Sequence, residues 1–329
     1  MSQDRTARAF WVTGPGASEI RTESLPVCQD GQIVVRCLYS GISRGTETMV
    51  FRGEVPASEH TRMRAPFQAG DFPGPVKYGY AAVGEVTEGP QALLDRRVFC
   101  LHPHQTEFVV PATAVQVIPE GVPAARAILA ANLETAINGL WDAQPGVGDR
   151  VAVIGAGSVG CLVAWLLRQI PGCQVQLIDT RPARHMIAQR LGLAFSLPEQ
   201  AVGECDLVFH TSGNPAGLQT ALDLAGQEAR LIEMSWFGQR TAHLQLGESF
   251  HSRRLTIQSS QVGEITAGRR SRWSFQRRLS LALSLLESSE LDALISDQSH
   301  FDDLPEVMAK LSTEPGNSIF HRIAYPSKD

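Results

Sequence analysis

The sequence lacks the features that mark several specialised classes of protein. Its six cysteines are dispersed over 329 residues without a C-x-x-C pair, and a chain of this length can bury a core without cross-links. We therefore expect reduced thiols and a cytoplasmic location. The longest uncharged run, residues 151–167, has 17 residues, fewer than the ~20 of a membrane-spanning helix. Residues 1–6 lack the cationic and apolar pattern of a secretory leader.

Lysine is scarce, and the 29 basic side chains are outnumbered by 34 acidic ones. The net charge of −5 gives no general attraction to nucleic acid or to an anionic membrane, so neither is expected as a partner. One local segment is basic and has Trp273 and Phe275 interleaved with its arginines. We interpret it as a solvated face, which at the mouth of a cleft would favour an anionic small-molecule substrate. Its arginines are Arg253, Arg254, Arg269, Arg270, Arg272, Arg277 and Arg278.

The pattern of the chain changes near Pro123. Before this point, short apolar segments separated by Gly and Pro turns indicate a β-rich unit, with strands expected at 8–12, 32–39, 81–86, 97–101 and 107–111. After it, a helical pattern at 124–143 leads into strands that alternate with helical stretches, which is typical of a parallel sheet. These strands are expected at 150–154, 174–179, 206–210, 229–234 and 255–258.

A third pattern begins near Ser274. It predicts a helix at 275–287, a connecting strand, a helix at 303–311 and a closing strand at 319–325. We therefore divide the chain into a β-rich domain at 1–123, an α/β domain at 124–274, and a C-terminal segment at 275–329 that returns to the first domain.

The strongest motif is a glycine-rich turn that directly follows the expected strand at 150–154. Gly155, Gly157 and Gly160 fit G-x-G-x-x-G, with Ser158 and Val159 between the second and third glycines. The first glycine permits a tight turn, the second lets the backbone approach a pyrophosphate, and the third lets the following helix pack on the strand. The phosphates would then lie at a helix N-terminus. The segment predicts a Rossmann dinucleotide-binding domain.

A carboxylate in the expected place supports this prediction. The next strand ends at Asp179, 19 residues after Gly160, where a carboxylate binds the adenosine ribose hydroxyls. Its charge repels a 2′-phosphate, so NAD is favoured over NADP. Arg181 and Arg184 leave NADP as an alternative cofactor, since arginines beside this pocket can pair with a 2′-phosphate.

The same turn has a second interpretation. Residues 156–160 also resemble a variant nucleophile elbow of an α/β-hydrolase, with Ser158 as the nucleophile. That function requires an oxyanion loop before the strand and an Asp and a His later in the chain. No Gly-rich oxyanion motif precedes the strand, and Asp179 would have no role.

Several segments in one order resemble the medium-chain dehydrogenase/reductase superfamily, over nearly the whole chain. They are Gly41-Ile42-Ser43-Arg44-Gly45-Thr46-Glu47, Gly79-Tyr80-Ala81-Ala82-Val83-Gly84-Glu85-Val86, Thr106-Glu107-Phe108-Val109-Val110-Pro111 and Val147-Gly148-Asp149-Arg150-Val151. The resemblance implies an α/β fold with a Rossmann cofactor-binding domain and a β-rich GroES-like catalytic domain. Dimers and tetramers are usual in this superfamily, so a homo-oligomer is an expected partner state.

The chain departs from the zinc-dependent members at each metal position. Ser43 replaces the first ligand Cys, Tyr80 replaces the ligand His, and Ala131 aligns roughly with the third ligand. A hydroxyl, a phenol and a methyl group do not form a Zn²⁺ site, so we expect no zinc. The pattern resembles a zinc-lacking branch that includes the bacteriochlorophyll-pathway dehydrogenase, which oxidises a 3-hydroxyethyl side chain to acetyl.

Without zinc, side chains must polarise the carbonyl and carry the proton. Tyr80 is the first candidate for proton donor or acceptor, the alternative being an aromatic side chain that fills the vacated metal cavity. Thr46 and Glu47 match family positions that would form a proton relay. His102 matches a substrate-pocket position where an imidazole can act as acid or base. Lys77 would lower the pKa of the phenol by its charge, or is a surface lysine.

The resemblance also carries two cofactor contacts over to this chain. Arg44 stands where the family places a pyrophosphate contact, and Thr135 matches a helix residue near the nicotinamide. We therefore expect an NAD(P)-dependent oxidoreductase that interconverts a secondary alcohol and a ketone without metal. The alternatives are an NADPH-dependent enone or quinone reductase and a non-catalytic dinucleotide-binding protein.

Overall fold

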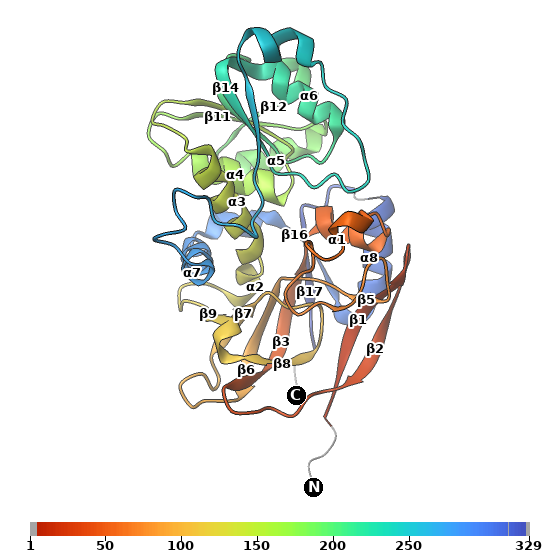
Figure 1. Cartoon of the computed structure of the whole chain (residues 1–329). Coiled ribbons are helices and arrows are strands. Elements are labelled where there is room, and N and C mark those ends of the chain that lie inside the picture. Colours follow the sequence, from red (N-terminus) through yellow and green to blue (C-terminus); the bar gives the residue numbers. More distant parts are fainter. Residues whose placement is uncertain (1–4, 315, 327–329) are drawn as a thin grey trace. The chain divides into compact units, whose positions relative to one another are not determined.

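The computed structural model describes residues 5–314 and 316–326, and many of its elements are labelled in Figure 1. The chain divides into two compact units. The first contains residues 1–131, 279–289 and 295–329, and the second contains residues 132–278 and 290–294. Residues 1–4, part of the segment on which the absence of a leader was argued, lie outside the described residues. No helix in the described part is long and apolar enough to cross a membrane.

The second unit is built on a parallel sheet. Its strand order is β12-β11-β10-β13-β14-β15, and every neighbouring pair is parallel. This corresponds to the 3-2-1-4-5-6 order of a Rossmann fold, whose order reverses between β10 and β13. The strands are β10 (Arg150–Ile154), β11 (Gln174–Ile178), β12 (Ala194–Ser196), β13 (Cys205–His210), β14 (Ala225–Glu233) and β15 (Thr256–Ser259). The α/β class expected from the sequence is confirmed.

Apolar runs place the central strands in the interior. Val151, Ala152, Val153 and Ile154 are all buried, because helices cover both faces of a parallel sheet. The helices of this unit are α3 (Ala130–Ala143), which begins at the unit boundary, α4 (Ser158–Leu167), α5 (His185–Arg190) and α6 (Pro215–Leu224).

The first unit is rich in β-strands, as expected. A four-stranded sheet has the order β2-β1-β5-β4, and a second sheet has the order β16-β17-β3-β6-β7-β9, with β8 paired to β3. The last strand, β17, pairs antiparallel with β3, so the end of the chain completes the sheet that its beginning forms. The strands are β1 (Thr6–Gly14), β2 (Ala17–Ser24), β3 (Gln32–Ile42), β4 (Ala69–Gly70), β5 (Val76–Lys77), β6 (Ala82–Glu88), β7 (Arg97–Cys100), β8 (Glu107–Pro111), β9 (Val115–Val117), β16 (Ile295–His300) and β17 (Phe320–Ala324).

Two helical regions differ from the sequence prediction. The single helix expected at 124–143 is divided into α2 (Ala124–Ala127) and α3, because the amide of Leu129 bonds the carbonyl of Arg126 and the turn tightens there. The remaining helices are α1 (Arg44–Phe51), α7 (Phe275–Leu285) and α8 (Leu304–Thr313).

The unit boundaries also differ from the expected 123/124 and 274/275. Helix α2 belongs to the first unit because it packs against β3 and β6. The start of α7 belongs to the second unit, where the Arg278 side chain is 1% exposed and forms an ion pair with Glu134 over 3.0 Å. Residues 290–294 belong there too, and Glu290 pairs with Arg168 of that unit.

Candidate cofactor and proton-transfer sites

The first and third glycines of the motif are required by packing within the second unit. Gly155 has φ +106°, a conformation that L-residues rarely adopt, and a Cβ there would lie 2.7 Å from Cα of Ser212. A Cβ on Gly160 would lie 1.9 Å from the carbonyl oxygen of Gly155. Both glycines therefore let α4 and the loop after β13 approach the end of β10.

The second glycine is different because no packing contact requires it. A Cβ on Gly157 would meet nothing within 4 Å, so its face of the turn is open. Gly157 is also the N-cap of α4 and, as a glycine, offers no side-chain cap to the first turn. An open turn at a helix N-terminus suits a bound phosphate.

The carboxylate of Asp179 lies against this turn at the end of β11. Its Oδ2 accepts a hydrogen bond of 2.8 Å from the amide of Ala156, and its Oδ1 accepts one of 2.9 Å from the amide of Arg181. Asp179 is partly buried. The structure thus brings together the two sequence features that predict dinucleotide binding, the glycine turn and the acidic residue.

Other predicted cofactor residues lie in different settings. Arg184 is 3% exposed, and its charge lowers the pKa of the Cys161 thiol in α4, so it is a buried arginine near that helix. Thr135 is partly buried on α3, and Val159 is partly exposed in the first turn of α4. Arg44 opens α1 in the first unit, where its guanidinium donates to the carbonyl of Ser318 over 3.2 Å.

The hydrolase interpretation of this turn finds no support in the contacts of Ser158. Its hydroxyl accepts a hydrogen bond of 3.0 Å from the side-chain Nδ2 of Asn132, a residue of α3. A nucleophilic serine would pair with an imidazole instead. The Oδ1 of Asn132 is buried without a partner in the described structure.

In the first unit, a buried pair of ionisable side chains joins α1 to the loop between β7 and β8. Glu47 Oε2 lies 2.8 Å from His104 Nε2, and Glu47 Oε1 accepts a 2.8 Å bond from the amide of Ser43. The side chains of Glu47 and His104 are 3% and 1% exposed. Because a carboxylate is purely an acceptor, Nε2 of His104 carries a proton toward it.

The chain of contacts continues from the other ring nitrogen. His104 Nδ1 lies 2.6 Å from Ser40 Oγ, which lies 2.9 Å from the hydroxyl of Tyr325. With a neutral imidazole, Ser40 donates to Nδ1 and accepts from Tyr325. Glu47, His104, Ser40 and Tyr325 therefore form a continuous buried hydrogen-bond relay.

Tyr80 lies beside this relay. Its hydroxyl makes hydrogen bonds with the side chains of Ser43 and Thr46, the second of which directly precedes Glu47 in α1. Burial, and secondly the charge of Glu47, raises the pKa of Tyr80 to about 12, although the two hydroxyl contacts lower it. The structure therefore brings together three of the predicted proton-transfer residues, Tyr80, Thr46 and Glu47.

His102, the fourth predicted residue, has other contacts. Its ring stacks on Phe108 with centroids 3.8 Å apart, and its Nδ1 lies 2.9 Å from the carbonyl of Pro103. Burial lowers the pKa of His102 to about 3, so its imidazole is neutral near pH 7. His104 is the histidine that joins Glu47. The local sequence does not show which of His102 and His104 contacts Glu47, because both histidines lie in one loop and Glu47 is 57 residues away from His104 in the chain.

Two interpretations of basic residues are wrong. Lys77 is not a surface lysine, because its side chain is 11% exposed and its ammonium donates to Glu23 over 2.7 Å and to Gln105 over 2.8 Å. It is also not among the groups that shift the pKa of Tyr80. Arg278 is not on a solvated face, since it is buried with Glu134 and Asn138.

The residues at the family's metal positions do not form a metal-ligand set. The hydroxyls of Ser43 and Tyr80 are engaged in the contacts above, and Ala131 has no donor atom in its side chain. Throughout the described ranges, no three His, Cys, Asp or Glu residues are grouped as metal ligands. The donor chemistry of these positions therefore does not fit Zn²⁺.

Comparison with known proteins places this architecture among alcohol dehydrogenase-like proteins. Residues 151–216 match the family described as ketopantoate reductase PanE/ApbA, a range that contains the glycine turn and the strands β10 (from Val151) to β13. A relative, the D-guloside 3-dehydrogenase of Escherichia coli K12, is 24% identical over 320 residues, which cover 88% of this chain and 91% of the relative.

Two solved structures share the fold over nearly their whole length. One is described as a short chain alcohol dehydrogenase, RspB, from Escherichia coli CFT073 complexed with NADH; its TM-score is 0.77 at 17% identity, covering 97% of this chain and 99% of that one. The other is a putative zinc-binding dehydrogenase from Sinorhizobium meliloti 1021 bound to NADP, with TM-score 0.78, 17% identity and the same coverage. The fold is thus the Rossmann and GroES-like combination of these proteins.

Proposed function

We propose that this chain is an NAD(P)-dependent oxidoreductase that interconverts a secondary alcohol and a ketone without a metal ion. The observation that carries the proposal is the open turn at Gly157 beside the carboxylate of Asp179, at the C-terminal edge of a Rossmann sheet. The activity named for the D-guloside relative supports a hydroxyl-bearing substrate.

The residues of the second unit fit a dinucleotide. The turn from Gly155 to Gly160 holds the pyrophosphate, with the amides of Ser158 and Val159 at the helix N-terminus. Asp179 binds the adenosine ribose, which favours NAD, and Thr135 contacts the nicotinamide end. Arg44 is proposed as a further pyrophosphate contact. The bound nicotinamide supplies or accepts the hydride.

Tyr80 carries the proton in this scheme. Because its pKa is raised to about 12, the phenol is protonated at neutral pH and can donate to the oxygen of a ketone as hydride adds to the carbon. In the direction of alcohol oxidation, the phenol oxygen of Tyr80 must first lose its proton so that it can accept the proton of the alcohol. Ser43 and Thr46 orient the phenol and stabilise its anion by donating hydrogen bonds.

The relay around Glu47 controls the charge near Tyr80 and offers a path for the proton. The Nε2 proton of His104 faces Glu47, and Ser40 and Tyr325 extend the path. His102 remains a candidate pocket residue that acts as a neutral imidazole. No step of this scheme uses zinc, because the donor set at Ser43 and Tyr80 does not fit it.

The finer identity of the enzyme follows from the same residues. The Ser43 and Tyr80 pattern supports the zinc-lacking branch, in which a hydroxyethyl-bearing pigment is one substrate candidate. We further propose that the protein acts in the cytoplasm on a small molecule, anionic if the arginine-rich segment lies at the cleft mouth, and that it works as a homo-oligomer.

The proposal is tested by titrating chelator-treated protein with NADH and NADPH while nicotinamide fluorescence is recorded. Binding of NADH that survives chelation, followed by turnover of secondary alcohols with no metal in the protein, is the expected result. A preference for NADPH would assign specificity to Arg181 and Arg184 and favour the enone reductase. If neither dinucleotide binds, the proposed function is wrong.

Asp179→Ser tests the cofactor assignment. We expect NADH affinity to fall about 10- to 150-fold, because a charged hydrogen-bond acceptor for ribose hydroxyls is worth about 1.5–3 kcal/mol. Affinity for NADPH should fall less, since the repulsion between the carboxylate and a 2′-phosphate is removed. The dissociation constants of NADH and NADPH, measured for the unmodified protein and the variant, give the change in preference between the two cofactors.

Asp206→Asn is the matched control for this change. Asp206 also accepts a backbone amide hydrogen bond, from Arg150 over 2.8 Å, but at the other end of β10. Its replacement should leave the affinities for both cofactors unchanged. Equal losses for NADH and NADPH in Asp179→Ser would show that Asp179 only holds the turn.

Glu47→Gln tests the relay. Since the charge of Glu47 raises the pKa of Tyr80, its neutralisation should move the pH profile of alcohol oxidation to lower pH. The interrupted relay should also lower kcat roughly tenfold, less than the loss of a direct acid–base group. Oxidation rates measured across pH separate the two effects.

Glu54→Gln is the control, because Glu54 pairs with Arg52 in the segment just after α1 and is 37% exposed. This variant should keep the pH profile of the unmodified enzyme. A profile that does not move in Glu47→Gln would exclude Glu47 from the reaction, provided that thermal unfolding shows an intact fold.

A further inference from the structure

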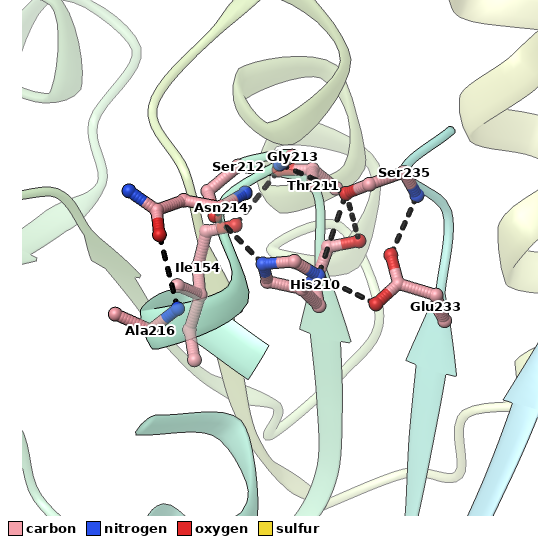
Figure 2. A network of polar contacts seen from close by, with 9 residues as sticks. All are labelled: Ile154, His210, Thr211, Ser212, Gly213, Asn214, Ala216, Glu233 and Ser235. Carbon is pink, nitrogen blue, oxygen red and sulfur yellow. Dashed lines mark hydrogen bonds and ion pairs between the residues drawn. The ribbon is translucent and has the colours of Figure 1, made fainter. Parts of the chain in front are cut away.

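A second buried network lies in the Rossmann unit, at the ends of two neighbouring strands (Figure 2). His210 ends β13 and is 0% exposed; its Nδ1 lies 2.6 Å from Glu233 Oε2, at the end of β14. Its Nε2 lies 2.6 Å from the hydroxyl of Ser212, an exposed residue. Glu233 Oε1 accepts a 2.6 Å bond from the amide of Ser235, which fixes the carboxylate.

The network is part of the edge that is proposed to bind the dinucleotide. The sheet order reverses between β10 and β13, and ligands of open α/β sheets bind at that point. The backbone of Ser212 packs directly against Gly155, since a Cβ on Gly155 would lie 2.7 Å from Cα of Ser212. The exposed hydroxyl of Ser212 is therefore next to the phosphate-binding turn.

The order Ser212, His210, Glu233 also resembles a hydrolytic triad, but the remaining parts of such a site are occupied. The amide of Gly213, the residue after the serine, donates to Ser235 Oγ over 3.0 Å, and the amide of Asn214 donates to Ser212 Oγ over 3.2 Å. An oxyanion hole needs such amides to face the substrate. The geometry therefore favours binding over acyl transfer.

The protonation of His210 decides which way the Ser212 hydroxyl points. Nδ1 donates to the carboxylate of Glu233 in either state. When the imidazole is neutral, Nε2 accepts the proton of Ser212, whose oxygen then offers only lone pairs to a ligand. When the imidazole is cationic, Nε2 donates to Ser212 Oγ, and the serine O–H is released to face the ligand as a donor. The charge of the His210–Glu233 pair changes at the same time from −1 to zero.

We propose that His210 is a positioning residue that sets the hydrogen-bonding polarity of Ser212 toward the bound dinucleotide, so that cofactor affinity rises as His210 gains its second proton. Protonation of His210 releases a hydrogen-bond donor and removes a negative charge, and both changes strengthen binding of the anionic pyrophosphate. The inference rests on the proposed dinucleotide binding and adds a specificity-determining group to it.

The groups that face His210 come from β10, β14, α6 and the loop after β14. On β10 its paired residue is Ile154, which is uncharged, and on β14 it is Glu233. From α6, Gly217 faces the ring. The loop after β14 supplies Ser235, whose hydroxyl lies 3.4 Å from Nδ1, and Phe237, whose ring stacks at 5.9 Å and has the Arg240 guanidinium 6.0 Å from its centroid.

The test is the dissociation constant of NADH, measured by fluorescence between about pH 6 and pH 9, the range in which histidines titrate. NADH is used because its pyrophosphate keeps its charge across this range. In the unmodified protein we expect the affinity to weaken roughly fivefold from the acidic to the basic end, the size of one hydrogen bond. His210→Gln cannot titrate and should bind with a flat profile.

Ser212→Ala keeps the test decisive if His210→Gln does not fold, because Ser212 is exposed. This variant should lose most of the pH dependence while His210 still titrates. His251→Gln, a change at an exposed histidine of the same unit, should keep it. A flat profile in the unmodified protein, or a full pH dependence in Ser212→Ala, overturns the inference. Failure of the unmodified protein and of all variants to bind NADH would instead contradict the proposed function.

Discussion

Tyr80→Phe is expected to lower kcat by about 10²–10⁴-fold, the usual contribution of a positioned acid–base group. The substitution removes the hydroxyl held by Ser43 and Thr46 and keeps the ring that fills the site. NADH affinity and thermal stability should change little, because Tyr80 lies in the unit that does not contain the glycine turn. Single-turnover rates of ketone reduction, measured together with NADH binding, separate these effects.

The pH dependence distinguishes a catalytic phenol from a packing residue. Since the raised pKa of about 12 keeps Tyr80 protonated, reduction by the unmodified enzyme should be nearly independent of pH around neutrality, while oxidation should accelerate as the pH rises. Tyr78→Phe is the control, because the ring of Tyr78 packs edge-on against Tyr80 at 6.0 Å. If Tyr80→Phe retains the rate and pH profile of Tyr78→Phe, Tyr80 is a packing residue and not an acid–base group.

Gly157→Val is expected to reduce NADH affinity by about 100-fold with little change in the free energy of unfolding. The chain leaves nothing within 4 Å of a Cβ at this position, so the fold tolerates the side chain. A dinucleotide does not, because its pyrophosphate must approach the backbone at the second glycine. Titration with NADH and a thermal melt of the same sample measure both quantities.

Gly268→Val is the matched control within the second unit, since a Cβ there also meets nothing within 4 Å. It should preserve NADH affinity. A Gly157→Val protein that folds and binds NADH normally would show that the open face of the turn does not receive the pyrophosphate, and would remove the observation on which the proposed function depends.

Local patterns were sufficient to predict most elements near the cofactor site. The strand at 150–154 coincides with β10, and the strand at 174–179 contains β11 (Gln174–Ile178) and ends at Asp179. These segments were predictable because a buried parallel strand is a short apolar run, and because the glycines obey constraints that lie within a few residues. The break between α2 and α3 was not visible, since helical periodicity continues through it.

The candidate proton-transfer residues show where local patterns stop being informative. Tyr80, Thr46 and Glu47 were found through a resemblance that preserves their positions, and the structure places them together. The sequence analysis singled out His102, and the structure shows that His104, from the same loop, is the histidine that contacts Glu47. Only the pairing of β3 with its neighbouring strands and the placement of α1 bring Glu47 to His104.

The sequence by itself determined the alternating strands and helices of the Rossmann unit and its glycine-rich turn, because each depends on residues close together in the chain. The order of the strands in the sheet came from the structure. The tertiary structure decided which ionisable groups meet: Glu47 with His104, Arg278 with Glu134, and His210 with both Glu233 and Ser212. Most of these partners are far apart in the sequence, and burial makes each pairing necessary, since an unpaired charge in the interior costs several kcal/mol.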